Sequence, residues 1–437
     1  MRYRLIGDYV LTMDDHATIH HPGQVTWEDG VILSVGPGDS DHSPVDQEIY
    51  APDHLVLPGL LNGHNHAAMS LLRGMADDSP LEEWLRQHIW PVEAKLTPDD
   101  IYLGTLLAAA EMIRSGTVGF ADMYFEVDRV AEAVRDSGLR GWISRGLVGF
   151  DDPGEEKLAW SREFARRWRE RGDGRIVPML GPHAPYTCSP AYLEKVAEAA
   201  RADGLAVHIH LSESPEEVRD MMRQYGKSPI QIAYDAGLFS VPTLIAHGVQ
   251  ITEADIPWLT RLSGGGVIAC PVSNAKLGNG IMPYRLLQEH RIPVGLGTDG
   301  AASTNTLDMF QEMKAMAWMQ KLQNQRPDAF TAYQALWAAT RGTAEVLGHP
   351  GGQLAPGAPA DLIAVRGRSD HMVPEWDPVA NVVYAAVGAD VDYTVVNGEI
   401  LLADGIITRF DEMAVIKEAR DRGAALKWLV EGESHGI

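Results

Sequence analysis

His64 and His66 stand one residue apart at the end of the apolar run "LVLPGLLNGHNH". Alternate residues of a β-strand point to the same face, so both imidazoles would face one point if this segment is a strand. Two imidazoles aimed at one point are typical of a metal site, but two surface histidines would look the same in the sequence. Other polar residues must decide between these interpretations.

Similar polar side chains follow several other strand-like segments. They are His183, His208, His210, Glu213, His247 and Asp299. Imidazole nitrogens combined with one carboxylate and a water suit Zn²⁺, and Fe²⁺ nearly as well. His208 and His210 share one face; we favour His210 as a ligand because Glu213 follows it and can turn back to the same centre, while His208 remains the alternative.

Taken singly, each of these residues also fits an ordinary structural role. Glu213 suits the cap of a helix, Asp299 a turn, and His247 the interior of a core. Only their convergence on one place would argue for chemistry, so the elements that carry them matter.

The segments around these residues alternate strand-like and helical runs. Eight strand-like runs occur between residues 58 and 356, and the stretches between them have helical periodicity, as in "DIYLGTLLAAAEMIRSG". Eight such units predict an α/β fold, a (β/α)8 barrel of the TIM type. Active-site residues of these barrels lie at the carboxyl ends of the strands, so the polar residues would meet at one mouth.

The two ends of the chain carry short β-rich pieces joined by tight turns, such as "WEDGVILSVG" and "VVNGEILLADG". Asp-Gly and Asn-Gly between strands favour hairpins. We expect residues 1–57 and 357–410 to build one small composite β-sandwich, residues 58–356 to form the metal-dependent barrel, and residues 411–437 to form a C-terminal helix.

The composition excludes some partners. The chain has 437 residues, of which 37 are basic and 60 acidic, and its net charge is -23. This charge would repel nucleic acid and anionic membranes, so we expect neither as a partner. No apolar run approaches the ~20 residues of a membrane span. With only Cys188 and Cys270 and no signal-like N-terminus, we expect a cytoplasmic protein.

Five segments resemble a known family. They are "PGLLNGHNHAAMSLLRGMADDSPLEEWLRQHIWPVEAKL", "MIRSGTVGFADMYF", "GPHAPYTCS", "HIHLSES" and "GTDGAASTNTLDMFQEMK". They resemble the amidohydrolase superfamily and, within it, the 5'-methylthioadenosine/S-adenosylhomocysteine deaminases, from the start of the chain to about Gly405. The resemblance implies hydrolytic deamination of the adenine ring of these nucleosides, or of adenosine or 5'-deoxyadenosine, to the inosine analogue and ammonia.

The resemblance also implies a one-metal site, because "RIVPMLGPHAP" lacks the lysine that bridges two metals in other branches. Glu213 matches the glutamate that shuttles protons, and His247 matches the histidine that holds the attacking water. Asp299 would join them in positioning that water and in passing a proton to the leaving amine. The residues that match the metal ligands are His64, His66, His210 and Asp299.

Four further residues match substrate contacts of the family. These are Glu93 for the ribose diol, His183 for the purine, Arg145 for the 5' tail, and Trp84 for the pocket wall. Two positions depart from the family pattern. Asn65 replaces the usual threonine between the paired histidines, and Lys157 stands where a further arginine would meet a carboxylate, so it keeps the charge but loses the bidentate fork.

Two alternatives remain open. The same scaffold supports other aminohydrolases or chlorohydrolases that act on a free base or a triazine ring, because a fold does not determine a function. The other alternative is a catalytically inactive relative that serves as a binding or assembly subunit, and the presence of Glu213, His247 and Asp299 argues against it. The expected partner is a small-molecule nucleoside, and self-association into a homo-oligomer is left open.

Overall fold

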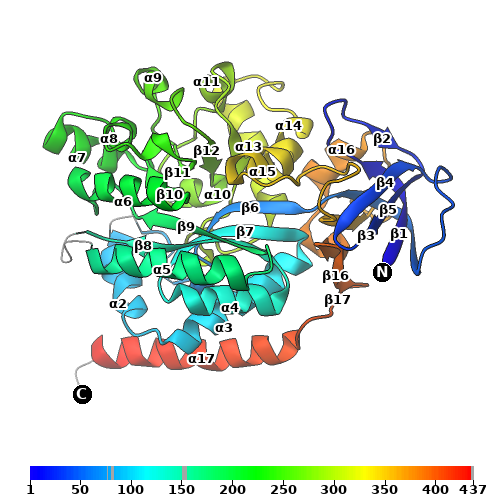
Figure 1. Ribbon diagram of the computed structural model, residues 1–437, viewed down its shortest axis with the longest axis horizontal. Coiled ribbons are helices and arrows are strands. Elements are labelled where there is room, and N and C mark those ends of the chain that lie inside the picture. Colours follow the sequence, from blue (N-terminus) through cyan, green and yellow to red (C-terminus); the bar gives the residue numbers. More distant parts are fainter. Residues whose placement is uncertain (76, 80–82, 150–154, 435–437) are drawn as a thin grey trace.

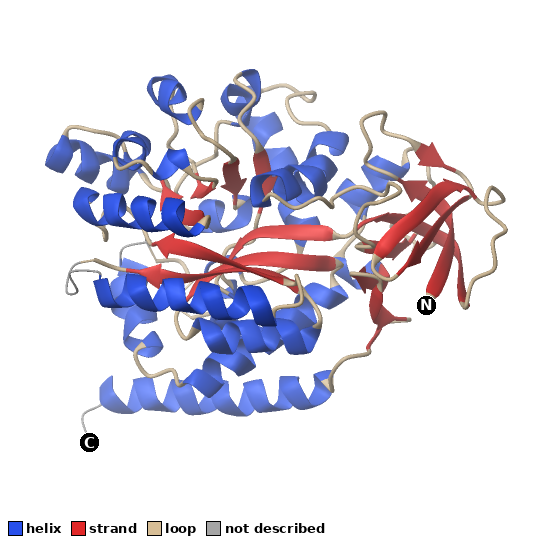
Figure 2. Ribbon diagram, in the orientation of Figure 1, coloured by secondary structure: helices blue, strands red, loops and turns tan. Residues whose placement is uncertain are grey.

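The computed structural model describes residues 1–75, 77–79, 83–149 and 155–434 of the chain (Figure 1). A barrel of strands surrounded by helices forms one part of the molecule, and a smaller β-rich part lies beside it (Figure 2). The last helix runs along the outside of the barrel part (Figure 1).

Eight parallel strands form the barrel, and every one of them is a segment that the sequence predicted. Strands that follow each other in the chain are neighbours in the sheet. The ring closes where the Asp299 N–H donates a 2.9 Å hydrogen bond to the His64 carbonyl. The strands are β6 (Leu60–Asn65), β7 (Thr117–Tyr124), β8 (Arg140–Leu147), β9 (Ile176–Pro182), β10 (Ala206–Leu211), β11 (Thr243–His247), β12 (Gly265–Ala269) and β13 (Val294–Leu296).

Helices cover the outside of this barrel, as α3 illustrates. Thr97 and Asp100 form a reciprocal capping box at its start, and Pro98 occupies its first position. The helices of this part are α2 (Trp90–Glu93), α3 (Pro98–Arg114), α4 (Val127–Ser137), α5 (Glu155–Arg171), α6 (Pro190–Asp203), α7 (Pro215–Tyr225), α8 (Pro229–Asp235), α9 (Ile256–Leu259), α10 (Pro271–Lys276), α11 (Tyr284–Glu289), α12 (Ala301–Thr304), α13 (Met309–Asn324), α14 (Ala332–Trp337) and α15 (Thr343–Leu347).

The smaller part is a mixed sheet built from both ends of the chain, as the sequence predicted. It folds around a core of its own that includes Leu5, Trp27 and Leu362. The segment from the N-terminal end, β5, lies between β1, to which it is parallel, and β14, to which it is antiparallel. The strands are β1 (Arg2–Leu11), β2 (Ile19–His20), β3 (Gly23–Glu28), β4 (Val31–Pro37), β5 (Gln47–Pro58), β14 (Leu362–Arg366), β15 (Val391–Val396), β16 (Glu399–Ala403) and β17 (Ile406–Ile407).

Gly59 separates β5 from β6 and is the point where the chain crosses between the two parts. A Cβ atom at this position would lie 2.1 Å from Cγ1 of Val118, so only glycine fits without a shift. Its N–H donates to the Asp361 carbonyl at 3.0 Å. We propose that residues 58–356 form the barrel part, that residues 1–57 and 357–410 form the smaller part, and that residues 411–437 form the C-terminal helix.

A buried ion pair joins the two parts. The Asp361 carboxylate accepts two hydrogen bonds from the Arg140 guanidinium, at 2.8 and 3.1 Å, one from the Asn397 N–H at 2.6 Å, and a contact from the His349 ring at 3.2 Å. Burial alone would raise the pKa of Asp361, but the hydrogen bond from His349 and the charge of Arg140 outweigh it and hold this pKa at about 2. The carboxylate is therefore ionised and bonded on both oxygens.

The remaining helices lie at the C-terminal side of the sequence: the short α16 (Pro378–Ala380) and the long α17 (Glu412–Ser434). Val415 and Ala419 of α17 pack against Leu103 of α3, and Arg422 pairs with the Asp100 carboxylate. Within the described part of the chain, no helix has the length and apolar character needed to cross a membrane.

Candidate active site

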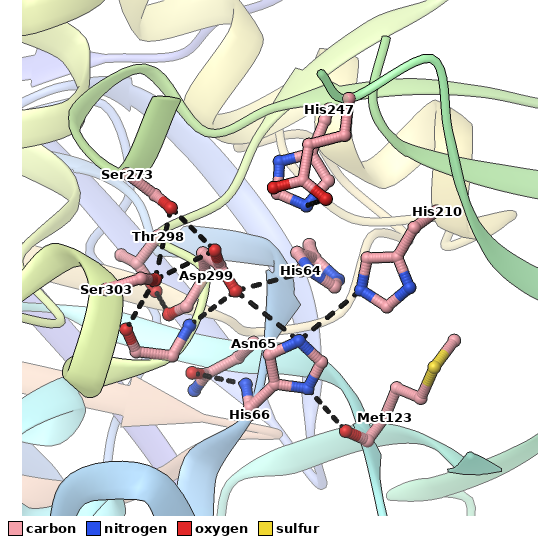
Figure 3. A network of polar contacts seen from close by, with 12 residues as sticks. His64, Asn65, His66, Met123, His210, His247, Ser273, Thr298, Asp299 and Ser303 are labelled. Atoms are coloured by element: carbon pink, nitrogen blue, oxygen red, sulfur yellow. Dashed lines mark hydrogen bonds and ion pairs between the residues drawn. The ribbon is translucent and has the colours of Figure 1, made fainter. Parts of the chain in front are cut away.

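Histidine and aspartate side chains from several barrel strands meet at the carboxyl ends of those strands (Figure 3). Asp299 Oδ1 lies 3.5 Å from His64 Nε2 and 3.4 Å from His66 Nε2, and His66 Nε2 lies 3.4 Å from His210 Nε2. The ligand atoms of His64, His66 and His210 lie within 4.8 Å of one another, and so do those of His64, His247 and Asp299. The structure thus brings the four predicted ligands and His247 to one point.

Three of the four imidazoles in this cluster have their Nδ1 atom held by an oxygen. An oxygen acceptor takes the ring proton at Nδ1 and leaves the Nε2 lone pair directed into the cluster, which is the arrangement typical of histidines that bind a metal. These contacts run from His66 to the Met123 carbonyl (2.5 Å), from His210 to the His183 carbonyl (2.8 Å) and from His247 to the Asn274 side-chain oxygen (3.1 Å).

The two carboxylate oxygens of Asp299 have different hydrogen-bond partners. Oδ2 accepts hydrogen bonds from the hydroxyls of Ser273 (2.6 Å) and Ser303 (2.8 Å). Oδ1 accepts the Gly300 N–H at 2.7 Å and faces the imidazoles. Asp299 has a positive φ of 66°, a backbone conformation that costs energy for a residue with a side chain. The fold therefore tolerates an unfavourable backbone conformation that directs one carboxylate oxygen toward the cluster.

The donor set fits a divalent metal ion. The His64 Nε2 atom is buried and has no hydrogen-bond partner, which is costly for a polar atom unless a ligand pairs with it. Burial lowers the pKa of His64 to about 3, so its ring is neutral at neutral pH and one of its two nitrogens carries a lone pair. Three neutral imidazoles and one carboxylate match the ligand preferences of Zn²⁺ and of Fe²⁺.

Glu213 lies beside this cluster, on the loop between β10 and α7. Its Oε2 is 3.8 Å from His247 Nε2, and its Oε1 accepts a hydrogen bond from the Asn279 amide at 3.1 Å. Burial, together with the negative charge of Asp299, raises the pKa of the Glu213 carboxyl to about 8. The side chain is therefore able to hold a proton at neutral pH.

The loop that carries Glu213 is fastened by Glu217. The Glu217 carboxylate accepts the backbone N–H groups of Ser212 at 3.2 Å and of Glu213 at 2.7 Å. Ser214 caps α7 by accepting the Glu217 N–H at 3.1 Å, and Pro215 occupies the first helical position. Ser212 has a φ of 54°, so the fastening also holds a strained residue.

A cavity of about 1240 Å³ opens onto the cluster. Glu93 lies in its wall, where Tyr124 donates a 2.7 Å hydrogen bond to its carboxylate. Trp84 is buried in the same wall, and its indole N–H donates to the Met75 carbonyl at 3.3 Å. The predicted site residues that line this cavity are His66, Trp84, Glu93, His183, His210, Glu213, His247 and Asp299.

Arg145 is not among the residues that line the cavity within the described part of the chain. Ser144 precedes it on β8 and points into the barrel, so Arg145 points outward, where its guanidinium lies 4.7 Å from the centre of the Trp160 ring of α5. A contact with a substrate tail remains a prediction that requires this side chain to turn. Lys157, also on α5, is likewise absent from the described lining.

Two residues beside the predicted ligands, Asn65 and His208, have contacts that support the structure around the cluster. The buried Asn65 turns away from the cluster toward Met112 of α3, and its side-chain oxygen accepts the His66 N–H at 2.8 Å. His208 is fully buried, with its Nε2 2.8 Å from His64 Nδ1. Among the paired histidines of β10, His210 is thus the one that faces the cluster.

Sequence reasoning missed several residues of the site. Ser273 and Asn274 lie in α10, the helix after β12, and Asn279 lies just beyond that helix, so the rule that barrel sites lie in the segments after strands points to this region. Tyr124 ends β7 and was open to the same rule. Glu217 carried no such signal, because a glutamate in the first turn of a helix is ordinary.

A parallel barrel with imidazoles and a carboxylate clustered at the carboxyl ends of its strands defines a class, the barrel hydrolases that use a metal site. The sequence matches the amidohydrolase family over residues 55–401. The chain belongs to this family, and the resemblance stated from the motifs is confirmed.

Individual relatives are similar over nearly the whole chain. A 5-methylthioadenosine/S-adenosylhomocysteine deaminase of Pelotomaculum thermopropionicum is 43% identical, over 96% of this chain and 98% of its own. A 5'-deoxyadenosine deaminase of Methanosarcina mazei is 45% identical, over 94% and 95%. The crystal structure of a Xanthomonas campestris adenosine deaminase with bound zinc has a TM-score of 0.93 and 33% identity, and the alignment covers 97% of this chain and 98% of that one.

Proposed function

We propose that this protein is a metal-dependent aminohydrolase that deaminates the adenine ring of 5'-methylthioadenosine, S-adenosylhomocysteine or a related 5'-substituted adenosine. The observation that carries the proposal is that one cavity is lined both by residues of the histidine-aspartate cluster with Glu213 and by the half-buried Glu93. The first group suits attack on the purine, and the second suits a ribose diol. The names of the relatives agree with this reading.

The residues that would hold the metal are His64, His66, His210 and Asp299, and zinc is the ion we propose. When bound there, a divalent ion would lower the pKa of a water from about 15.7 to about 7. His247 would orient that water through Nε2, because its Nδ1 is held by Asn274.

Glu213 would move the protons. Its raised pKa, about 8, lets the carboxylic acid give a proton to N1 of adenine, which makes C6 electrophilic. As the water oxygen bonds to C6, the water gives up one proton, which passes through Glu213 or Asp299 to the exocyclic nitrogen, and the C6–N bond breaks. The proton that remains on the C6 hydroxyl returns to Glu213, which restores the carboxylic acid and leaves a C6 carbonyl. Ammonia and a hypoxanthine base are the products.

Glu93 would bind the 2'- and 3'-hydroxyls of the ribose. Tyr124 donates to one of its oxygens at 2.7 Å, and the residue lines the cavity in which the ligand would lie. His183, whose ring lines the cavity and contacts the Thr187 hydroxyl at 2.9 Å, is placed for the purine.

We further propose a cytoplasmic location, in keeping with two buried cysteines, Cys188 and Cys270, that form no disulfide. Self-association into a homo-oligomer is proposed from the resemblance alone, and light scattering on the purified protein tests it.

Ammonia release by the zinc-loaded protein tests the function. The panel contains 5'-methylthioadenosine, S-adenosylhomocysteine, 5'-deoxyadenosine, adenosine, adenine and guanine, and Glu213→Gln serves as the inactive control. Fast release from the 5'-substituted nucleosides and none from the free bases is expected. Release from the free bases alone would overturn the nucleoside assignment, and no release from any compound by a protein that binds zinc would overturn the deaminase.

A further inference from the structure

His64 differs from the other imidazoles of the cluster in what holds its second nitrogen. The Nδ1 atoms of His66 and His210 face backbone carbonyls, which only accept, so each ring must carry its proton there. His64 Nδ1 instead lies 2.8 Å from His208 Nε2. Either imidazole can carry the proton between two such nitrogens, so this contact alone does not decide which nitrogen of His64 keeps a lone pair.

Ser144 decides the direction of the proton. Its hydroxyl donates a 3.0 Å hydrogen bond to the Asp122 carbonyl, and the same oxygen lies 3.4 Å from His208 Nδ1. A hydroxyl has one proton, and the shorter contact takes it, so the oxygen lone pair faces His208 Nδ1 and that nitrogen must donate.

The consequence passes along the chain of contacts to His64. His208 is fully buried, which disfavours a charged ring, so a ring protonated at Nδ1 accepts at Nε2. The proton in the 2.8 Å contact then belongs to His64 Nδ1, and His64 Nε2 keeps its lone pair. That atom is the one that lies buried without a partner beside Asp299.

We propose that Ser144 and His208 are positioning residues that fix His64 in the tautomer able to bind the metal. This inference rests on the metal site of the proposed function and adds to it two residues outside the described lining of the cavity. It gives the first histidine of the "HIHLSE" motif a role distinct from that of the second. The role requires an acceptor at the position of His208 Nε2, not an imidazole as such.

We call the contacts from Ser144 through His208 to His64 the relay. Metal affinity tests this relay without reference to catalysis. Zn²⁺ is titrated against a competing chelator in the wild type and in His208→Met, His208→Gln and Ser144→Ala. His208→Met fills the space without an acceptor and is expected to weaken binding about 10- to 100-fold, the usual effect of losing such an outer contact. His208→Gln places an amide oxygen near Nε2 and is expected to bind nearly as tightly as the wild type, and Ser144→Ala to lose less than His208→Met.

Two results would overturn the relay: His208→Met binding as tightly as the wild type, or His208→Gln binding no better than His208→Met. Thermal unfolding of the metal-free proteins shows whether each variant folds, and if His208→Met does not, Ser144→Ala decides, with unchanged affinity counting against the relay.

A second measurement reads the tautomer directly. ¹⁵N spectra of the metal-free protein with labelled histidine rings, assigned with His64→Asn, are expected to show a proton on His64 Nδ1 and none on Nε2. A proton on Nε2 would overturn the proposal. Ammonia release by the wild type is a separate test. If the variants bind Zn²⁺ as predicted but the wild type deaminates no nucleoside, the proposed substrate is wrong and the relay still stands.

Discussion

The Tyr124 hydroxyl donates a 2.7 Å hydrogen bond to Oε1 of Glu93, and this bond joins barrel strand β7 to helix α2 in the wall of the cavity. Burial raises the pKa of Glu93, and the hydrogen bond from Tyr124 opposes that rise. Tyr124 thereby favours the ionised form of the carboxyl that we assign to the ribose.

Tyr124→Phe is expected to raise the KM for 5'-methylthioadenosine about tenfold, because a hydrogen bond to a charged group contributes roughly 1.5 to 3 kcal/mol. Glu93→Ala is expected to have a larger effect of the same kind. Steady-state kinetics measure both. Tyr102→Phe is the matched control, since its hydroxyl bonds Asp136 at 3.0 Å away from the cavity. A fall in kcat with unchanged KM would contradict the assignment of Glu93 to the ribose.

Glu217→Ala is expected to lower kcat about 100-fold with little change in KM, because the loop that aims Glu213 loses its two backbone anchors and a misplacement of about 1 Å has that effect. Single-turnover measurements check the chemical step. Glu198→Ala removes an exposed glutamate from helix α6 and should behave as the wild type. Equal kinetics for both variants would show that Glu217 does not position Glu213.

Ser273 and Ser303 donate to the same oxygen of Asp299. Each single change to alanine leaves one donor to Asp299, so each single variant should lose little Zn²⁺ affinity. The double variant should lose more affinity than the sum of the two single losses, about 10- to 100-fold in total. Chelator competition on all four proteins completes the cycle. Strict additivity would mean that the two hydroxyls act independently.

Asp361 predicts a specific dependence of stability on pH. Its pKa is lowered to about 2 in the folded protein, so it stabilises the fold above its ordinary pKa of 3.8, and that contribution is lost as the pH falls toward about 2. The contribution is about 2 kcal/mol. Urea unfolding at several pH values should show Asp361→Asn less stable than the wild type at pH 6, with the difference shrinking between about pH 4 and pH 2. Asp370→Asn, at an exposed position, should show no such convergence.

The period-2 rule of strands explains both the strongest and the weakest predictions from sequence. The rule placed His64 and His66 on the same face of the strand. Because two histidines occupy that face, the pair itself identified it as the face of interest. In "GWISRGLVG" the same rule separates Ser144 from Arg145 but does not say which of them faces inward, because a barrel strand is covered on both sides. The family resemblance assigned Arg145 to the 5' tail of a substrate, whereas the structure places Ser144 inside the barrel.

Contacts between distant segments account for the rest. The contact between His64 and His208 joins β6 to β10, and the hydrogen bond from Asn279 to Glu213 joins a loop after β12 to one after β10. Each depends on side-chain distances across the barrel, and no local pattern encodes these. The strands, their order and the cluster were predictable, but the groups that orient the cluster were not.

The pairing of β5 with β14, with Pro58 opposite Leu362, has a consequence for synthesis on the ribosome. The strands near the N-terminus emerge first, but the entire barrel part is synthesised before their partner strand β14 is made. During that interval, the edge of β5 offers unpaired backbone groups to any other extended chain. Completion of the C-terminal strands therefore protects the nascent protein from pairing with its neighbours, and a chain that stops before β14 is expected to aggregate.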